Sequence, residues 1–532
     1  RVAGPMIGVV ATGAGLAVGE LLVGAIEGAV SPVVAVGTKV IDLVPLPLKN
    51  WAVETFGTSD KVVLVVTTLA ILFIAGIVIG TLAVTGRRTS ALIGTAVVGL
   101  VGVAAVLTRP DPTVAEVVPI VVGTLVSGGV LCWLAPPATV AVDVVAPPSH
   151  AVATVGVTDE FSPIEPAPAI IPGSGVADRR VFLLRSVGVA SLAAVTGGVG
   201  RMLQRRYDVG EERAAIALPS VAEQRPAAVL PPNADLDVEG LSAFVTPNAD
   251  FYRIDTALVV PQISTDGWRL RIHGMVDREL ELTFDDLLAR DQIEAYVTLA
   301  CVSNPVGGPY VGNALWQGVR LAELLAEVGV DPASTQLLST SADGWTCGTP
   351  VSSLTDGRNA MLAVAMNGEP LPAEHGYPVR MVVPGEYGYV SATKWLVDME
   401  FTTWDAATAY WVPRGWSQEA PMKTMTRIEV PEHDASVERG AVQVAGTAYA
   451  VHRGISAVEV RVDGGEWVRA DLGGVPSPDT WRKWSTSIDV GTGEHTIEAR
   501  ATDGLGSVQT AEIADVAPNG ASGYAVIDLT AE

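Results

Sequence analysis

Charge and cysteine are both scarce in this sequence. Lys, Arg, Asp and Glu make up 17% of its 532 residues, against roughly 25% in a typical soluble domain. Hydrophobic residues reach 49% and the mean hydropathy is +0.37, which excludes a disordered chain and argues against a wholly soluble protein. Only 3 Cys are present, too few for a disulfide-rich scaffold. We therefore expect a folded chain with a membrane part.

Several cofactor and catalytic motifs are missing from the sequence. It contains no Cys-x-x-Cys-His, Walker A, dinucleotide-binding glycine motif, His-Glu-x-x-His or Gly-x-Ser-x-Gly. The 6 His residues lie outside the long apolar segments, so a haem held by two His cannot form within the membrane. We therefore expect no haem in this chain.

The two halves of the chain differ in charge. Residues 1–209 contain 13 basic and 13 acidic residues, whereas residues 210–532 contain 21 basic and 45 acidic residues and carry the whole net charge of −24. An apolar, neutral half followed by an acidic half indicates a membrane part and a water-facing part. The acidic balance argues against nucleic acid as a partner.

Residues 1–135 are predicted to form about four transmembrane helices in a lipid bilayer. An apolar segment at roughly 5–30 contains Glu20 and Glu27. Glu20 is interpreted either as a functional acid within the membrane or as a residue near the interface or facing neighbouring helices. Three more runs are uncharged and have the length of about 20 residues that a span needs: 62–86, 89–108 and 117–142.

The next segments are predicted to be a linker and a further apolar helix. Residues 136–178 are rich in Pro, which breaks helices, and are predicted to be a cytoplasmic linker. Within 179–206, Arg179 and Arg180 precede Phe-Leu-Leu and an uncharged run, which resembles a twin-arginine export signal. The alternative is an ordinary anchoring helix with its positive charges on the cytoplasmic side.

Both interpretations give the same orientation. Arg179 and Arg180 lie in the cytoplasm, as Arg87 and Arg88 should, and residues from about 207 onward lie outside the cytoplasmic membrane. The Pro- and Glu-rich segment 207–245 is predicted to be a tether. Because the twin-arginine route exports folded proteins, such a signal would also predict a buried cofactor in the downstream part.

The water-facing half is predicted to form two domains. Residues 246–426 mix strands and short helices, which is typical of the α+β class. Residues 427–532 show short strands separated by turn signals, which predicts an immunoglobulin-like β-sandwich. In the α+β part the predicted elements are strands at Trp268–His273, Tyr296–Ala300, Met361–Met366 and Val379–Val383, and helices at Thr283–Leu288 and Val319–Val328.

Cys301 is the thiol most suited to chemistry. It ends a hydrophobic strand and enters a loop rich in Asn, Pro and Gly, where the backbone approaches another group closely. A lone Cys at a strand end is usually a small buried side chain. A thiolate, however, also suits a soft metal centre that has other sulfur ligands.

Several motifs between residues 251 and 396 resemble those of one enzyme family. Thr298-Leu-Ala-Cys301-Val-Ser-Asn304 resembles the molybdenum-ligand segment of the sulfite oxidase family of molybdopterin enzymes. Residues 427–532 resemble that family's dimerisation domain, and the membrane half is similar to membrane-anchored actinobacterial members. The family's other motifs are matched by Phe251-Tyr252-Arg253, His375-Gly-Tyr-Pro-Val-Arg380-Met-Val-Val-Pro-Gly385, Tyr387-Gly388 and Ser391-Ala-Thr-Lys394-Trp395-Leu396.

The resemblance implies a molybdenum–molybdopterin cofactor, with one pterin per metal, and two-electron oxygen-atom transfer. Cys301 would be the protein ligand of molybdenum rather than a nucleophile. Arg380 and Lys394 would bind the phosphate of the pterin, and His375 the pterin itself. The complete set of cofactor-binding residues that the resemblance implies is Tyr252, Arg253, Cys301, Ser341, His375, Arg380, Ser391 and Lys394.

One departure from the family pattern concerns the substrate. Sulfite oxidases place an Arg after the Asn of this segment, whereas Asn304 is followed by Pro305. The missing anion-binding charge favours reduction of a small S- or N-oxide over the alternative, oxidation of sulfite. A hypothesis of another class is a non-catalytic subunit of a membrane assembly. An enzyme would need a separate electron partner, a quinone or a haem protein, and the sandwich suggests a homodimer.

Overall fold

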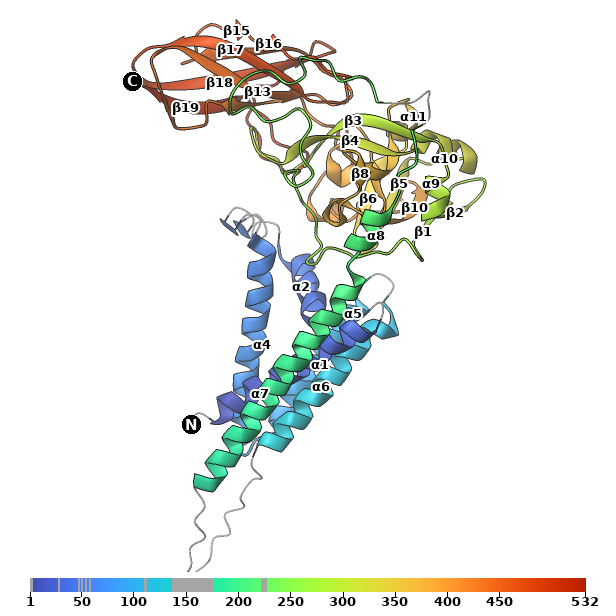
Figure 1. The fold of residues 1–532 in the computed structure, drawn as a ribbon, viewed down its shortest axis with the longest axis vertical. Helices are drawn as coiled ribbons and strands as arrows, with labels where there is room; N and C mark the ends of the chain where they lie inside the picture. Colours follow the sequence, from blue (N-terminus) through green and yellow to red (C-terminus); the bar gives the residue numbers. More distant parts are fainter. Residues whose placement is uncertain are drawn as a thin grey trace, which may run out of the picture. The chain divides into compact units, whose positions relative to one another are not determined.

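The chain forms two compact units, Arg1–Arg206 and Tyr207–Glu532. The computed structural model (Figure 1) describes residues 3–26, 29–45, 48, 51–52, 55–56, 59–109, 112–135, 176–221 and 227–532. Most of the predicted linker therefore lies outside the described residues. The predicted fold class is confirmed, with apolar helices, an α+β domain and a β-sandwich.

The first unit is a bundle of apolar helices. Five of the described helices are long and apolar enough to cross a membrane, so the chain is membrane-associated. The predicted run at 117–142 corresponds to a helix that ends at Leu134, and a short helix, α2, was not predicted. The bounds are α1 Ala3–Ala25, α2 Pro32–Leu43, α4 Asp60–Val84, α5 Arg88–Leu107, α6 Val114–Leu134 and α7 Val176–Gln204.

Helix α1 is the centre of this bundle and packs against α4, α6 and α7. Glycines let the backbones approach closely, as is common between membrane helices. A Cβ atom at Gly8 would lie 1.7 Å from the carbonyl oxygen of Gly76 in α4, and one at Gly200 in α7 would lie 2.7 Å from that of Glu20. The close contacts between these helices therefore depend on glycine, which has no side chain to separate the backbones.

The side chain of Glu20 faces neighbouring helices, as one of the two interpretations of this residue expects. Its carboxylate accepts a hydrogen bond from Ser31, the residue before α2, and one of 3.0 Å from Gln204 at the end of α7. This carboxylate therefore joins the ends of three helices.

Replacing Gly8 by Val should separate α1 from α4. Overpacking a close contact costs about 1–3 kcal/mol, and here the added atoms would meet backbone rather than a movable side chain. We expect a lower unfolding temperature for the detergent-solubilised chain. Gly129→Val is the matched control, because a Cβ at Gly129 meets nothing within 4 Å. Equal melting of the two variants would contradict this packing.

Two sheets form the core of the α+β domain, one mixed, with β1 parallel to β10, and one antiparallel. The first has the order β2-β1-β10-β5-β6 and the second β3-β4-β7-β8, with β9 paired to β7. Their strands are β1 Arg269–Gly274, β2 Leu280–Thr283, β3 Gln292–Ala300, β4 Val311–Arg320, β5 Gln336–Ser341, β6 Thr346–Pro350, β7 Met361–Met366, β8 Glu369–Pro370, β9 Arg380–Val382 and β10 Leu396–Thr402.

The short helices connect these strands. The predicted helix after Thr283 is present as α9, and Thr283 and Asp286 form a capping box at its start. The helix predicted from Val319 begins two residues later, because Val319 and Arg320 still pair with β7. The helices are α9 Phe284–Leu288, α10 Leu321–Val328, α11 Ser352–Thr355, η3 Ala373–His375, η4 Gly388–Val390 and η5 Val412–Arg414.

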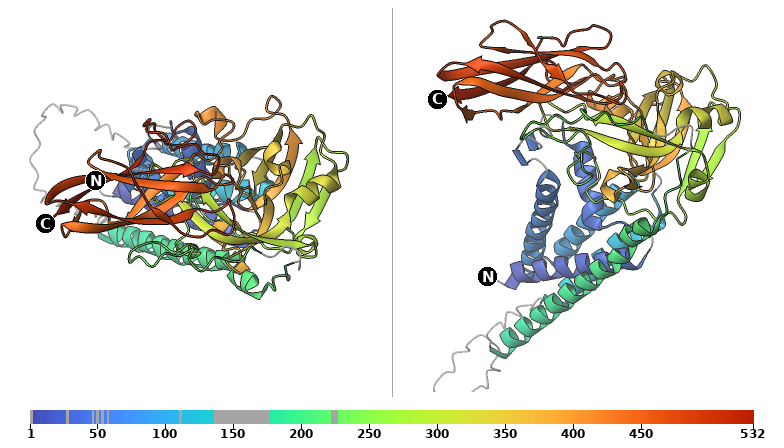
Figure 2. Two further views of the ribbon diagram at one scale, coloured as in Figure 1. Left: turned by 90° about the horizontal axis from the view of Figure 1, so that it is seen from above. Right: turned by 45° about the horizontal axis from the view of Figure 1, so that its top comes forward.

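The C-terminal part is a sandwich of two sheets lying face to face (Figure 2). The sheet orders are β11-β13-β17-β16 and β12-β19-β18-β14-β15, and apolar side chains from both fill the space between them around the fully buried Trp484. The strands are β11 Met425–Val430, β12 Ala435–Val437, β13 Gly440–Tyr449, β14 Ile455–Val462, β15 Val468–Arg469, β16 Asp471–Leu472, β17 Arg482–Val490, β18 Gly493–Asp503 and β19 Ala525–Ala531.

The segment predicted as a tether packs onto the second unit. It begins with η2 Arg205–Tyr207 and α8 Gly210–Ala215. The side chain of Phe244 is fully buried, and its carbonyl oxygen accepts a 2.9 Å hydrogen bond from the indole of Trp481. Composition indicated a polar tether, but a few apolar residues suffice to hold the segment against the domain.

Candidate cofactor-binding site

Cys301 follows directly after β3, at the edge of a loop. The buried pattern of β3 fixes the strand, and the backbone N–H of Cys301 donates to the carbonyl of Tyr310 at 2.9 Å. Its Sγ atom lies 2.9 Å from the hydroxyl of Ser303. Burial raises the pKa of the thiol, so the free thiol is protonated at neutral pH. A metal ion that bound it would displace this proton.

Tyr252 lies close to both Cys301 and Arg380. Burial, and next the neighbouring Cys301, raise the pKa of the Tyr252 hydroxyl, while Arg380 acts in the opposite direction. Gly388 lies against both groups, because a Cβ there would be in van der Waals contact with the carbonyl oxygen of Ala300, at 3.6 Å, and with the Tyr252 hydroxyl, at 3.7 Å. The strand end that carries the thiol, a phenol and a cation therefore share one site.

Arg380 is a buried cation without an acidic partner. It is 5% exposed and makes no ion pair among the described residues. Its Nη1 atom donates to the carbonyl of His375 at 3.0 Å, and its guanidinium stands 4.9 Å above the Trp316 ring. Its Nε atom is buried without a hydrogen-bond partner. Burial lowers its pKa to about 10, so the side chain stays charged at neutral pH.

Lys394 extends this positive region. Its Nζ atom lies 2.6 Å from Asp255 Oδ2 and donates to the carbonyl of Glu374 at 3.1 Å. Burial lowers its pKa to about 8, against the opposing effect of Asp255. Gly376 has φ +113°, and a Cβ there would lie 3.0 Å from the Cβ of Arg380 and 3.1 Å from the Cα of Lys394. The turn at Gly376 thus packs closely against both Arg380 and Lys394.

His375 lies in the same turn. It is 3% exposed, and its Nε2 atom lies 2.9 Å from the carbonyl oxygen of Asn248, which acts as acceptor. Burial lowers its pKa to about 4. The imidazole is therefore neutral, with its proton on Nε2 and an acceptor left on Nδ1.

The low pKa of His375 makes a prediction for stability. In the unfolded chain a His takes up its proton near pH 6.5, whereas the folded chain does so only near pH 4. The unfolded state therefore binds more protons between these values, and stability falls as pH falls through them, by about 3 kcal/mol in all. Urea unfolding of the cofactor-free chain measures this loss, and His375→Gln should reduce it.

The other predicted residues are placed less directly. Arg253 pairs with Asp255 at 2.9 Å, so it reaches the positive region through that shared acid. Ser341 ends β5 opposite Leu396, and its hydroxyl is buried without a partner. Ser391 donates its hydroxyl proton to the carbonyls of its own loop, at Glu386 and Tyr387, which leaves it only acceptor capacity for a ligand.

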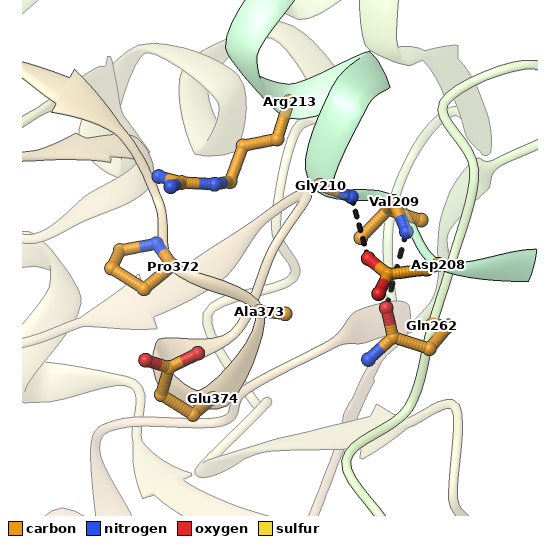
Figure 3. A pocket seen from close by; sticks show the side chains of 8 residues that line it. All are labelled: Asp208, Val209, Gly210, Arg213, Gln262, Pro372, Ala373 and Glu374. Carbon is orange, nitrogen blue, oxygen red and sulfur yellow. Dashed lines mark hydrogen bonds between the residues drawn. The ribbon is translucent and has the colours of Figure 1, made fainter. Parts of the chain in front are cut away.

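Asp255 was not anticipated from the sequence. It forms ion pairs with Arg253 and Lys394. The sequence places Asp255 two residues after Arg253, but an acid at that distance is too common to predict a site residue. A separate hollow of about 300 Å³ (Figure 3) shares Glu374 with this region but not Cys301. It is lined by Asp208, Val209, Gly210, Arg213, Gln262, Pro372, Ala373 and Glu374.

The donors fit an anionic, heavily hydrogen-bonding cofactor. Arg380 Nε and Ser341 Oγ are buried without partners, which is costly unless a ligand completes them. A phosphate would pair with the isolated charge of Arg380, and the thiol of Cys301 offers a soft ligand to a metal. The class of protein that fits such a site is an oxidoreductase that binds a metal together with an anionic organic cofactor.

Known proteins support this class. Residues 257–411 match the family described as oxidoreductase molybdopterin binding domain. The chain is 34% identical over 149 residues to an uncharacterized oxidoreductase, YuiH, of Bacillus subtilis, covering 28% of this chain and 72% of that protein. It is 30% identical over 330 residues to human mitochondrial sulfite oxidase, covering 51% of this chain and 58% of that protein.

The chain belongs to the sulfite oxidase family of molybdopterin-dependent oxidoreductases, and it is an enzyme. It spans 58% of the length of the human enzyme that it matches. Among solved structures it is similar to the sulfane dehydrogenase SoxCD of Paracoccus pantotrophus, with 25% identity and a TM-score of 0.45 over 55% of this chain and 81% of that one. The domain implies a molybdenum–pterin cofactor.

Proposed function

We propose that this protein is a membrane-anchored oxidoreductase that transfers an oxygen atom to or from a small substrate, most favourably by reducing an S- or N-oxide. One observation carries this proposal: a partly accessible thiol, Cys301, and a buried cation, Arg380, both lie close to Tyr252, and Arg380 makes no ion pair among the residues that the structure describes. When bound, the cofactor supplies the two-electron redox chemistry. The chain's own residues bind it, orient it and limit access of water.

The roles of the site residues follow from their contacts. Cys301 would provide the thiolate ligand to molybdenum. Arg380 and Lys394 would bind the phosphate, and the Nδ1 acceptor of His375 would take a hydrogen bond from the pterin. No cluster of three or more His, Cys, Asp or Glu is found among the described residues. The remaining ligands would then come from the pterin dithiolene and from oxygen.

The loop after Cys301 supports the choice of substrate. Asn304 is 4% exposed; its side chain accepts from the N–H of Tyr310 at 2.8 Å and donates to the Tyr449 hydroxyl at 3.4 Å. The Asn304 side chain is therefore occupied by hydrogen bonds that stabilise the loop, and Pro305 contributes no positive charge for an anionic substrate. A doubly charged substrate such as sulfite finds one cation fewer than the family pattern provides, whereas a neutral oxide does not need it. Sulfite oxidation is the second candidate.

The charges that flank the helices support a proposal for the location. Arg87, Arg88, Arg179 and Arg180 flank apolar helices and favour the cytoplasmic side, which would place the catalytic unit outside the cytoplasmic membrane. The motif at Arg179 favours export of this unit in a folded state. Electrons would come from a separate quinone or haem protein, and the sandwich would support a homodimer.

The test uses the purified full chain in detergent. We expect about one molybdenum per chain, reduction of a sulfoxide with an artificial electron donor, and slower oxidation of sulfite with an artificial acceptor. Sulfite turnover without sulfoxide reduction would reverse the order of the two substrates. A chain that contains no molybdenum when it is produced with the cofactor present would refute the proposed function.

A further inference from the structure

The loop Pro384–Ser391 forms one wall of the candidate site. Gly388 of this loop approaches both the carbonyl oxygen of Ala300, next to Cys301, and the hydroxyl of Tyr252. The loop therefore lies against the strand end that carries Cys301 and against Tyr252. The role of this loop rests on the proposed function only for the identity of that cofactor.

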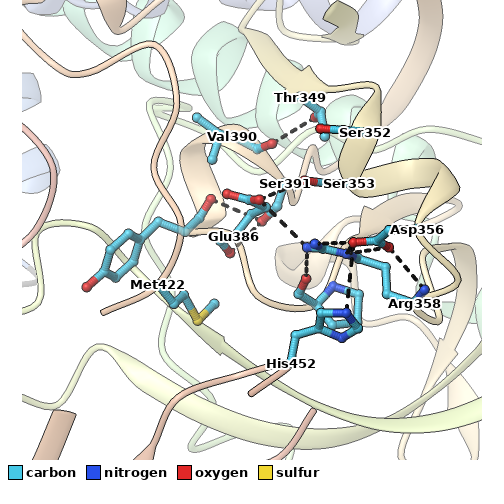
Figure 4. A network of polar contacts seen from close by, with 12 residues as sticks. Thr349, Ser352, Ser353, Asp356, Arg358, Glu386, Val390, Ser391, Met422 and His452 are labelled. Carbon is cyan, nitrogen blue, oxygen red and sulfur yellow. Dashed lines mark hydrogen bonds and ion pairs between the residues drawn. The ribbon is translucent and has the colours of Figure 1, made fainter. Parts of the chain in front are cut away.

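A network of polar groups contacts the loop and stabilises its conformation (Figure 4). Arg358 Nη1 donates to the carbonyl of Pro384 at 2.5 Å and lies 3.7 Å from Glu386 Oε1. Glu386 is 6% exposed, and its Oε1 also accepts from Ser353 at 2.8 Å. The carbonyl of Val390 accepts from Thr349 at 2.8 Å. Arg358 is thus the charged group that contacts the start of the loop.

The β-sandwich supplies the next link of this network. Arg358 Nη2 lies 2.6 Å from Asp356 Oδ2, and that carboxylate is 3.9 Å from His452 Nε2 in the sandwich. The other ring nitrogen of His452, Nδ1, lies 3.0 Å from Asp479 Oδ1. His452 therefore bridges two carboxylates, one from each domain, and its proton offsets their repulsion.

Asp479 also reaches the strand that carries Cys301. Its backbone carbonyl accepts from the N–H of Thr298 in β3 at 3.0 Å, and the hydroxyl of Thr298 accepts from the N–H of Trp481 at 2.7 Å. His452 thus lies between the loop and the Cys301 strand, and both form the site.

We propose that His452, acting through Asp356 and Arg358, positions the loop Pro384–Ser391, so that docking of the β-sandwich holds the cofactor site in its binding conformation. His452 is a positioning residue in this role. The sandwich then serves the site of its own chain, beyond any part in dimer formation.

The charges around His452 predict a pH dependence. The titratable and charged groups that face it are Asp479, Asp356 and Arg358. The hydrogen bond to Asp479 raises the pKa of His452 above its ordinary value of 6.5, while Arg358 opposes this. A raised folded-state pKa gives a contribution that is complete below pH 6.5 and is lost as pH rises through the folded-state value.

Hydrogen exchange of the full chain in detergent tests the proposal. The variant is His452→Asn, because His452 has φ +71° and Asn tolerates that conformation. At pH 6 we expect amides of the loop, among them that of Tyr387, to exchange about tenfold faster than in the wild type, the effect of one charge-assisted hydrogen bond. At pH 9 the difference should shrink. Release of molybdenum and pterin should accelerate in parallel.

The control is His495→Asn, which removes another His–Asp pair of the sandwich, that with Asp463, and should leave loop exchange unchanged. Unchanged loop exchange in His452→Asn would overturn the proposal. So would equal acceleration at pH 6 and pH 9, or faster exchange throughout β18 and β19, which would mean a loosened sandwich. The wild type could contain no molybdenum while His452→Asn still accelerated loop exchange at pH 6 and less so at pH 9. That result would refute the proposed function and leave the positioning role of His452 intact.

Discussion

Cys301→Ser should lower the rate of turnover by at least about a hundredfold, because loss of an outer partner of a metal ligand already costs 10–100-fold. Serine keeps the size and the hydrogen bond to Ser303, so the fold around β3 is preserved. A neutral hydroxyl is a hard, weakly acidic group and replaces the thiolate poorly at a soft metal. Steady-state reduction of a sulfoxide measures the loss.

A second measurement separates ligation from general damage. Molybdenum X-ray absorption of Cys301→Ser should show one sulfur neighbour fewer, whereas Cys132→Ser, a substitution in helix α6 of the first unit, should show the wild-type spectrum and rate. Full activity in Cys301→Ser would contradict the assignment of this residue as the metal ligand. An unchanged spectrum would contradict it as well, even if the activity fell.

The parts of the fold that could be predicted are those fixed by local pattern. The alternation around Trp268–His273 identifies β1, and the apolar run before Cys301 identifies β3, because strand periodicity is a property of neighbouring residues. Long uncharged runs identified the membrane helices for the same reason. The placement of Cys301 at the end of a strand could thus be predicted from the sequence alone.

The rest depends on contacts between distant parts of the chain. Lys394 and Asp255 are 139 residues apart and form a 2.6 Å ion pair, and no local pattern indicates which acid meets which cation. The strand β4 continues past Val319 because it pairs with β7, although residues 319–328 have helical periodicity. Phe244 is buried in a cluster that includes Trp481, whose indole also donates a hydrogen bond to the Phe244 carbonyl, and composition alone had indicated a tether.

These long-range contacts also change the role of the C-terminal sandwich. A resemblance between domains predicts a surface for dimer formation, but the described contacts run to the site itself. The Tyr449 hydroxyl accepts a hydrogen bond from the side chain of Asn304, and Arg427 Nη1 donates to the carbonyl of Gly308 at 3.4 Å. The loop after Cys301 is therefore held by residues of both domains, and its conformation depends on their docking.

Arg380→Met should separate cofactor binding from stability. The substitution removes a buried charge that makes no ion pair among the described residues, and with it the desolvation cost of keeping that charge out of water. The folded cofactor-free chain should therefore unfold at the same or a higher urea concentration. The affinity for the anionic pterin should fall by about 10–100-fold, the effect usually seen when a supporting contact in a metal site is lost.

The two readouts are molybdenum per chain after gel filtration and the midpoint of urea unfolding. Arg320→Met is the matched control, because Arg320 also has a buried Nε without a partner but donates to the carbonyl of Gly357 rather than to a residue of the candidate site. We expect normal molybdenum content in that variant. If Arg380→Met kept its molybdenum and lost stability instead, Arg380 would be a structural residue stabilised by His375 and Trp316. The buried charge would then be balanced by the protein alone, and the case for an anionic ligand at this position would fail.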